Sequence, residues 1–160
     1  MKHTARISLI LLAIFTLIFF SARERGIYTF WHSNVKRLSS EEGLECISDT
    51  KPIIIDARTP QEFKTSHLEN ALLFNQELID TLSKETPLLI YCTVGVRSNN
   101  LANQLSEKGF TEIYELKRGI LGWANDELPL VNEQGAITDK IHVYSKFFTS
   151  FLKNGKAVYQ

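Results

Sequence analysis

The sequence predicts an α/β domain, a parallel sheet flanked by helices, preceded by a hydrophobic N-terminal helix. Two short apolar runs, residues 53–55 (III) and 88–91 (LLIY), are typical of strands buried on both faces of a parallel sheet. Helix signals alternate with these runs, which is the pattern of strand–helix–strand units. Ligands of such sheets gather at the carboxyl ends of the strands, and Cys92 directly follows the second run.

The first half of the domain contains two helix start signals. The motif SSEE at residues 39–42 is a capping-box pattern and predicts a helix to about residue 47. The motif TPQE at 59–62 combines a capping threonine, a proline at the first helical position and a capping glutamate, and predicts a second helix to about residue 65. We expect a strand at 71–74, followed by a helix that Asn75 caps.

The second half is built around the apolar run at 88–91. A turn is expected to follow it, and then a helix whose residues Leu101, Ala102 and Leu105 face inward. Gly109 stands where that helix should end. The predicted elements are a turn at 92–97, a helix at 98–108, a strand at 112–116 and a short helix at 119–125.

Charge is distributed unevenly, although the formal net charge is zero. Residues 1–37 hold six basic residues and one acidic residue, whereas residues 38–160 hold twelve basic and seventeen acidic residues. Nucleic-acid binding needs basic surface, so the excess of acidic residues in 38–160 argues against a nucleic-acid partner. Two cysteines, Cys46 and Cys92, are too few for a disulfide scaffold, and their spacing does not establish a bridge. Because the four histidines are scattered, we expect no metal, and no cofactor is needed.

Residues 1–26 are interpreted as a membrane anchor or signal segment. Basic residues precede an almost wholly apolar run at 7–20, which is shorter than the roughly 20 residues of a full membrane span. A small-x-small cleavage pattern is missing, because Phe20 lies two residues before Ala22, and this favours an uncleaved anchor over export after cleavage. Positive residues after the run favour a domain that faces the cytoplasm. The similarity to an export signal favours the periplasmic or extracytoplasmic side, which we expect.

The stretch around Cys92 contains the candidate chemistry. A strand, a tight loop and a helix N-terminus place successive N–H groups around one point, which forms an anion-binding nest. Gly95 permits backbone angles that a side chain forbids, and Arg97 adds positive charge. These features favour the nucleophilic thiolate of Cys92 and suit an oxyanion donor such as thiosulfate. The loop residues expected to bind substrate are Thr93, Val94, Gly95, Val96 and Arg97.

Both cysteines have a simpler interpretation as buried thiols, since free cysteine is commonly buried. For Cys92 the strand-to-helix loop with its glycine and arginine makes catalysis the better interpretation. Cys46 lies within a predicted helix near Leu44 and Ile47, so packing is favoured there over a role as a resolving thiol.

Residues 38–130 resemble a single-domain rhodanese, and three blocks carry the resemblance. They are IIDAR at 54–58 with EF at 62–63 and SHLENA at 66–71, YC to RS at 91–98, and LKRG at 116–119 with GW at 122–123 and LP at 128–129. The resemblance implies the rhodanese fold and a sulfurtransferase that works through a Cys92 persulfide. Such an enzyme moves a sulfane sulfur from a thiosulfate- or persulfide-type donor to a thiol, to cyanide or to a protein acceptor.

The resemblance also places three side chains outside the loop. Asp56 and His67 are interpreted mainly as structural residues that hydrogen-bond to backbone near the loop. Arg58 is expected to line the substrate entrance, with a salt bridge as the alternative. The departures from the family pattern are Ser66, Asn70 and Arg118, which stand where glycine is usual; we expect changes in local turns, and at Arg118 a change in the pocket rim.

Two other functions fit the sequence less well. Phosphatases with a related loop separate the cysteine and the arginine by five residues, whereas four separate Cys92 from Arg97, and the smaller loop suits a single sulfur atom better. A non-catalytic membrane-tethered module for binding or redox sensing is the remaining alternative, although inactive relatives usually lack the cysteine.

Outside the resemblance, residues 27–37 are interpreted as a linker and residues 131–160 as a C-terminal extension. Ile141, Tyr144, Phe148 and Phe151 follow helical spacing and predict an amphipathic helix. We expect it to pack against the domain, with binding to a membrane surface as the alternative.

Overall fold

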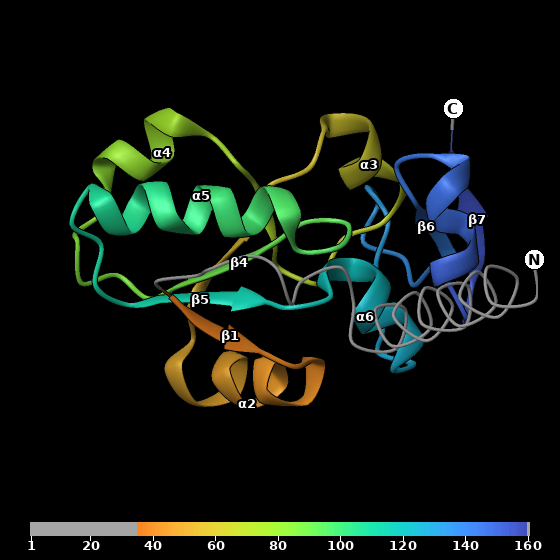
Figure 1. The fold of residues 1–160 in the computed structure, drawn as a ribbon, viewed down its shortest axis with the longest axis horizontal. Coiled ribbons are helices and arrows are strands. Elements are labelled where there is room, and N and C mark those ends of the chain that lie inside the picture. Colours follow the sequence, from red (N-terminus) through yellow and green to blue (C-terminus); the bar gives the residue numbers. More distant parts are fainter. Residues whose placement is uncertain (1–34, 160) are drawn as a thin grey trace, which may run out of the picture. The chain divides into compact units, whose positions relative to one another are not determined.

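The computed structural model describes residues 35–159. Its centre is a five-stranded sheet in the order β1-β5-β4-β2-β3 (Figure 1). Every pair of neighbouring strands in this sheet is parallel, as predicted. The strands are β1 (Lys36–Leu38), β2 (Ile53–Asp56), β3 (Leu72–Leu73), β4 (Leu88–Tyr91) and β5 (Ile113–Leu116).

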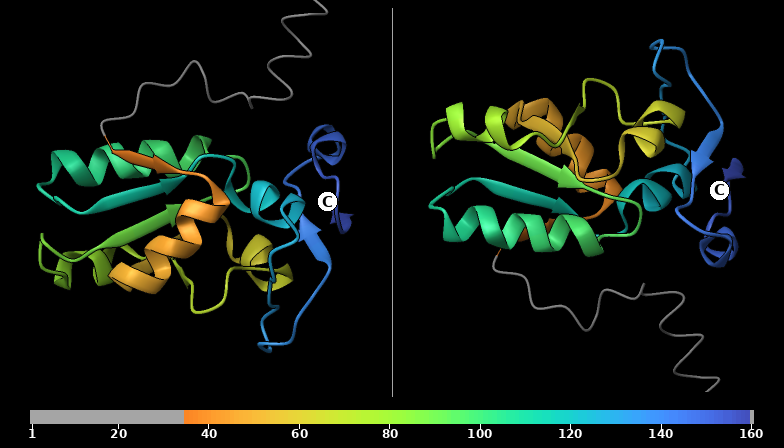
Figure 2. Two further views of the ribbon diagram at one scale, coloured as in Figure 1. Left: turned by 90° about the horizontal axis from the view of Figure 1, so that it is seen from below. Right: turned by 90° about the horizontal axis from the view of Figure 1, so that it is seen from above.

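Helices cover both faces of this sheet. In Figures 1 and 2, α4 and α5 lie on one face and α2 lies on the opposite face. The prediction of a parallel sheet flanked by helices is therefore confirmed. The helices are α2 (Ser40–Thr50), α3 (Pro60–Thr65), α4 (Gln76–Thr81), α5 (Val96–Glu107) and α6 (Gly119–Asn125).

The predicted helix starts are confirmed by their capping contacts. The Ser39 hydroxyl accepts the amide N–H of Glu42 at 3.2 Å, and the Glu42 carboxylate accepts the amide N–H of Ser39 at 2.6 Å. Thr59 and Glu62 repeat this reciprocal arrangement at the start of α3. The side chain of Asn75 accepts an N–H of α4 at 2.8 Å. These contacts involve residues two or three positions apart, which explains why the local sequence was sufficient to locate them.

A hydrophobic core cluster lies between the sheet and helices α4 and α5. Leu88 and Ile90 of β4 are fully buried and pack with Ile79 of α4 and Leu105 of α5. Every residue of β4 is buried, which accounts for the wholly apolar run in the sequence. This strand holds the residue that follows it, Cys92, on a well-packed support.

Strand β1 was not predicted. It pairs in parallel with β5 and contains Lys36 and Arg37, which belong to the predicted linker. Only its last residue, Leu38, is buried, so the strand has no apolar run by which to recognise it. The tertiary pairing with β5 creates this strand.

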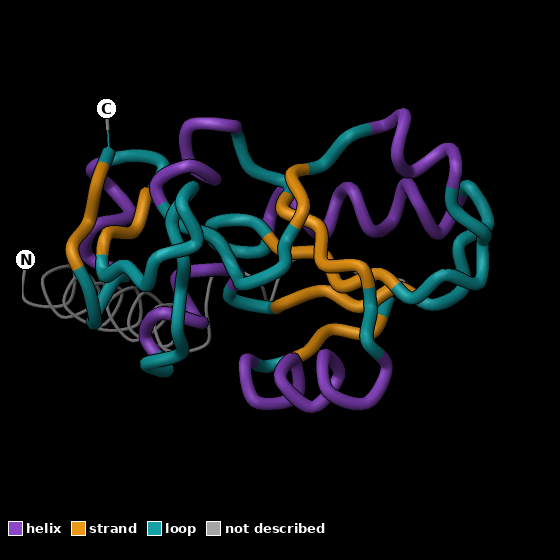
Figure 3. The backbone as a smooth tube through the Cα atoms, turned by 180° about the vertical axis from the view of Figure 1, so that it is seen from behind, coloured by secondary structure: helices purple, strands orange, loops and turns teal. Residues whose placement is uncertain are grey.

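The prediction of an amphipathic C-terminal helix is wrong. The extension instead forms β6 (Lys140–His142), the 3-10 helix η2 (Lys146–Phe151) and β7 (Lys156–Val158), and β6 pairs in parallel with β7 (Figure 3). Tyr144 has a φ of 68°, which no α-helix accommodates. A 3-10 helix has three residues per turn, so the apolar residues do not form one continuous stripe, and Phe147 remains 62% exposed.

The extension nevertheless packs against the domain, as expected. The Asn125 side chain at the end of α6 accepts the amide N–H of Lys153 at 2.6 Å and donates to the carbonyl of Phe151 at 2.8 Å. The guanidinium of Arg97 lies 5.2 Å from the centre of the Tyr144 ring. The extension therefore reaches the loop that contains Cys92.

The predicted anchor or signal segment at 1–26 and most of the linker lie outside the described residues. Between residues 35 and 159, no helix combines the length and the apolar composition that crossing a bilayer requires.

Candidate active site

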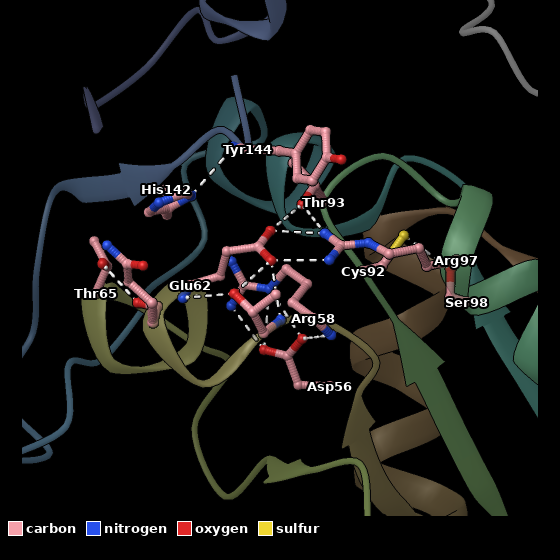
Figure 4. Close-up of polar contacts among 12 residues, drawn as sticks. Asp56, Arg58, Glu62, Thr65, Cys92, Thr93, Arg97, Ser98, His142 and Tyr144 are labelled. Atoms are coloured by element: carbon pink, nitrogen blue, oxygen red, sulfur yellow. Dashed lines mark hydrogen bonds and ion pairs between the residues drawn. The ribbon is translucent and has the colours of Figure 1, made fainter. Parts of the chain in front are cut away.

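Cys92 stands where β4 ends and the loop to α5 begins, as the sequence predicted. Its side chain is buried, with 1% of the residue exposed. The amide N–H of Gly95 lies 3.1 Å from the sulfur, and the hydroxyl of Ser98 lies 3.4 Å from it. Figure 4 shows the sulfur beside Ser98 and the backbone of Arg97. The sulfur is thus held by groups that can stabilise negative charge on it.

The start of α5 extends this polar environment. Gly95 is the N-cap residue, with a φ of 95° and no side-chain capping bond. The amide N–H groups in the first turn of a helix have no helical carbonyl partner, and here they lie at the loop around the sulfur. Together with the helix dipole they favour an anion at this point.

Helix α6 fixes the loop from the other side. The amides of Ile120 and Leu121 donate to the carbonyls of Cys92 and Thr93 at 2.8 and 3.2 Å. A Cβ atom at Gly119 would lie 2.2 Å from the carbonyl oxygen of Cys92, and Gly119 has a φ of 51°. Only glycine permits this approach. Arg118, which stands where the family usually has glycine, forms an ion pair with Asp126.

Arg97 reaches the loop, but its charge is paired with Glu62. The two terminal nitrogens of Arg97 lie 2.8 and 2.7 Å from the two carboxylate oxygens of Glu62, and one of them also donates to the Thr93 hydroxyl at 2.8 Å. Figure 4 shows this paired arrangement below the Tyr144 ring. From the sequence, Glu62 is only a capping residue and part of a family block. Its burial and its pairing with Arg97 arise from the fold.

Several contacts determine the ionisation of Glu62. Burial alone would raise its pKa. Hydrogen bonds from Arg97, from the Thr59 amide and from the Thr93 hydroxyl, with the Arg97 charge, instead lower the pKa to about 2. Glu62 is therefore ionised across the physiological pH range, and it links α3 to the Cys92 loop.

The expectation that Arg58 lines the substrate entrance is wrong. Its side chain is 0% exposed and forms an ion pair with Asp56 at 2.7 Å. It also donates to the carbonyl of Ser66 at 2.5 Å. Asp56 in turn accepts the Tyr91 hydroxyl at 2.7 Å. This buried network connects β2, β4 and the segment after α3, so Arg58 stabilises the fold beneath the loop, which was the alternative considered.

The remaining loop residues and His67 have structural contacts. Thr93 donates its hydroxyl to Glu62 at 2.8 Å, Val94 is buried, and Val96 begins α5. A ring nitrogen of His67 lies 2.9 Å from the carbonyl of Phe63. His67 thus contacts the backbone of α3.

A second polar chain behind the sulfur was missed by the sequence analysis. The Ser98 hydroxyl lies 2.8 Å from a carboxylate oxygen of Glu115 in β5, and the other oxygen lies 2.8 Å from Nε of Arg37 in β1. Glu115 is 0% exposed. Burial raises its pKa, while hydrogen bonds from Arg37 and Ser98 act in the opposite direction. The available signal was Glu115 itself, an acid between Tyr114 and Leu116 within the predicted strand.

The second cysteine lies apart from this site. Cys46 is buried in α2, and both thiols are free, so the possible Cys46–Cys92 bridge is absent. Burial raises the pKa of the Cys46 thiol. Within residues 35–159, no three side chains of His, Cys, Asp or Glu lie together in a way that could hold a metal ion.

Comparison with known proteins identifies the family of this domain. The model of the rhodanese-like domain matches residues 39–126. The tRNA uridine(34) hydroxylases of Chlamydia felis and of Chlamydia trachomatis serovar L2 are each 35% identical to the chain over 100 residues, which cover 55% of this chain and 31% of the relative. The chain therefore spans about a third of the length of these curated relatives.

Solved structures show the same fold. A rhodanese-related protein from Thermoplasma volcanium has a TM-score of 0.54 at 23% identity, covering 62% of this chain and 100% of that one. A thiosulfate sulfurtransferase from Pseudomonas aeruginosa has a TM-score of 0.54 at 21% identity, covering 66% of this chain and 22% of that one. Because the rhodanese-like domain matches more than half of the chain, the chain belongs to the rhodanese family.

Proposed function

We propose that this chain is a sulfurtransferase that transfers a sulfane sulfur through a persulfide on Cys92. The observation that carries the proposal is the surroundings of the Cys92 sulfur, where the Gly95 amide, the Ser98 hydroxyl and the start of α5 converge. These groups stabilise a thiolate before the reaction and the terminal sulfur of a persulfide after it. No metal or organic cofactor is required for this chemistry.

The reaction consists of two exchanges at sulfur. The Cys92 thiolate attacks the outer sulfur of thiosulfate, the bond between the two thiosulfate sulfurs breaks, and sulfite leaves with the electron pair. Cys92 then carries a persulfide whose terminal sulfur is negatively charged. An acceptor thiolate or cyanide attacks that sulfur, and the Cys92 thiolate leaves. Both steps transfer neutral sulfur between anions, so no external oxidant is consumed.

The chemistry of the chain favours donors and acceptors that are small molecules or proteins. Residues 38–160 hold twelve basic and seventeen acidic residues, and an acidic body does not attract a polyanion such as tRNA. The matched relatives are named as hydroxylases of a tRNA uridine, but the match covers only 31% of their length. The proposal therefore rests on the Cys92 loop, which lies inside the matched domain.

The test follows a sulfur atom on the protein. Full-length protein is treated with thiosulfate, analysed by intact-mass spectrometry and assayed for thiocyanate formation with cyanide. We expect the parent chain to gain the mass of one sulfur atom and to turn over, and Cys92→Ser to do neither. Cys46→Ser is the matched control and should behave like the parent, because that thiol is buried in α2.

The outcomes separate the alternatives. Mass gain with turnover supports an enzyme that uses small donors, and mass gain without turnover supports a carrier that requires a protein acceptor. If folded, reduced protein acquires no sulfur from thiosulfate or from a persulfide donor, sulfur transfer is excluded. The binding or redox-sensing module then becomes the better assignment.

A further inference from the structure

Cys92 must lose a proton before it can act as a nucleophile, and the structure provides an internal acceptor. The residue is 1% exposed and lies next to Ser98, which is 0% exposed. The Ser98 hydroxyl oxygen lies 3.4 Å from the Cys92 sulfur and 2.8 Å from a Glu115 carboxylate oxygen. A continuous chain of polar atoms therefore runs from the thiol into the protein interior.

One proton on Ser98 must serve two acceptors. A serine hydroxyl carries a single O–H donor and two acceptor lone pairs. When Glu115 is ionised, the hydroxyl donates to the carboxylate, which is the shorter contact. Its lone pair then faces the sulfur and can accept the S–H of a thiol. When Glu115 is protonated, the carboxyl can donate to Ser98, and the hydroxyl is free to donate to a Cys92 thiolate.

We propose that Glu115 accepts the Cys92 thiol proton through Ser98 and holds it while the thiolate and the persulfide are present. In this step the S–H bond of Cys92 and the O–H bond of Ser98 break. A new O–H bond forms on Ser98 from the thiol proton, and another forms on Glu115 from the former serine proton. The products are a thiolate and a neutral carboxyl group, so the total charge of the pair is unchanged.

The surroundings of Glu115 suit this exchange. Burial raises its pKa, which makes this carboxylate a better proton acceptor than an exposed one. Arg37 of β1 contacts the carboxylate oxygen that does not face Ser98, and the more distant Lys117 acts in the same direction as Arg37. Arg37 lies outside the matched rhodanese-like region, 39–126. This device is therefore assembled partly by a strand that precedes that region.

The inference rests on the proposed thiolate chemistry, but its test needs no sulfur donor. The rate of Cys92 alkylation by iodoacetamide is measured from pH 6 to pH 8 on the full chain, using the mass of the Cys92 peptide so that Cys46 does not contribute. When a thiol and a carboxyl share one proton, the fraction of molecules with a thiolate stays constant over the pH range between the two titrations of the pair. We therefore expect the parent rate to change less than about threefold over this range.

Two variants interrupt the exchange at different points. Glu115→Gln removes the acceptor, and Ser98→Ala removes the bridge while leaving the contact between Glu115 and Arg37. In both, the thiol must release its proton to solvent, and the alkylation rate should rise steeply with pH, by up to about tenfold per pH unit. Glu112→Gln is the matched control on an exposed acid three residues before Glu115, and it should retain the flat parent profile.

Each outcome is decisive. A flat profile in the parent and in the control, with a steep profile in Ser98→Ala, supports the proton transfer even if Glu115→Gln does not fold. If the alkylation rate depends on pH in the same way in the parent and in Ser98→Ala, whether the profile is flat or steep, the proposed proton transfer is overturned. Because alkylation reports the thiolate alone, a parent that shows the flat profile but never gains sulfur would refute the sulfurtransferase proposal and leave this inference intact.

Discussion

Glu62→Gln is expected to destabilise the domain by about 3 kcal/mol. The carboxylate accepts two N–H groups of Arg97 at 2.7 and 2.8 Å, the Thr93 hydroxyl at 2.8 Å and the Thr59 amide at 2.9 Å. A glutamine side chain has one acceptor oxygen and one NH2 group. In either orientation of the glutamine amide, its NH2 group faces an N–H donor, so the hydrogen bonds that one carboxylate oxygen of Glu62 accepted are lost.

This magnitude agrees with the cost of breaking the ion pair and with the lowered pKa of Glu62. Breaking a buried ion pair by removing one partner costs about 3–5 kcal/mol. The Arg97 side chain is 33% exposed, so water replaces part of the lost contact, and about 2–4 kcal/mol remains. Separately, the pKa of Glu62 is lowered from 4.5 to about 2, a difference that corresponds to about 3 kcal/mol.

Urea denaturation measures this effect, with Glu69→Gln as a matched control on an exposed glutamate. Because the pKa of Glu62 is lower in the folded state, its contribution is fully present above pH 4.5 and is lost as the pH falls toward 2. The gap between the parent and Glu62→Gln should therefore be widest near pH 7 and should close in acid. A gap of less than about 0.5 kcal/mol at pH 7, no larger than for a typical surface substitution, would refute the reasoning.

Two further substitutions test the supports of the loop. Gly119→Ala places a Cβ atom 2.2 Å from the Cys92 carbonyl and should lower stability by more than about 2 kcal/mol, with loss of persulfide loading. Gly135 has a φ of 75° and open space around it, so Gly135→Ala should cost only about 1 kcal/mol of backbone strain. Equal losses of stability in the two variants would contradict the proposed clash at Gly119. Tyr91→Phe removes the hydroxyl that Asp56 accepts at 2.7 Å and should cost about 1–3 kcal/mol in urea denaturation while persulfide loading persists; unchanged stability would show that the hydroxyl does not matter.

Local sequence determined the main elements of the fold. The capping motifs at 39–42 and 59–62 act over three residues, and the structure contains both. The wholly apolar run at 88–91 became the buried central strand β4. The strand–loop–helix pattern placed Cys92 at the end of that strand. These features depend on neighbouring residues or on a simple hydrophobic pattern, and such information is present in a single sequence.

Only the tertiary structure decided which charges surround the loop. Glu62 pairs with Arg97, 35 positions later, and Arg37 pairs with Glu115, 78 positions later. Arg58, expected at the entrance, is instead sequestered by Asp56. Charged side chains carry no periodic signal that reveals a distant partner, and their burial depends on strands and helices that meet only after folding.

The C-terminal extension shows the same limit. Helical spacing predicted one amphipathic helix, but β6 pairs with β7 and η2 lies between them. The contacts that Asn125 makes with Phe151 and Lys153 join α6 to the segment that leads into β7. Periodicity in a short segment is a weak signal, and tertiary pairing overrides it. The sequence by itself therefore determined the rhodanese domain and the position of Cys92 at the end of its central strand. The partners of its buried charges and the path of its last thirty residues were decided by packing, because those contacts form only when distant segments come together.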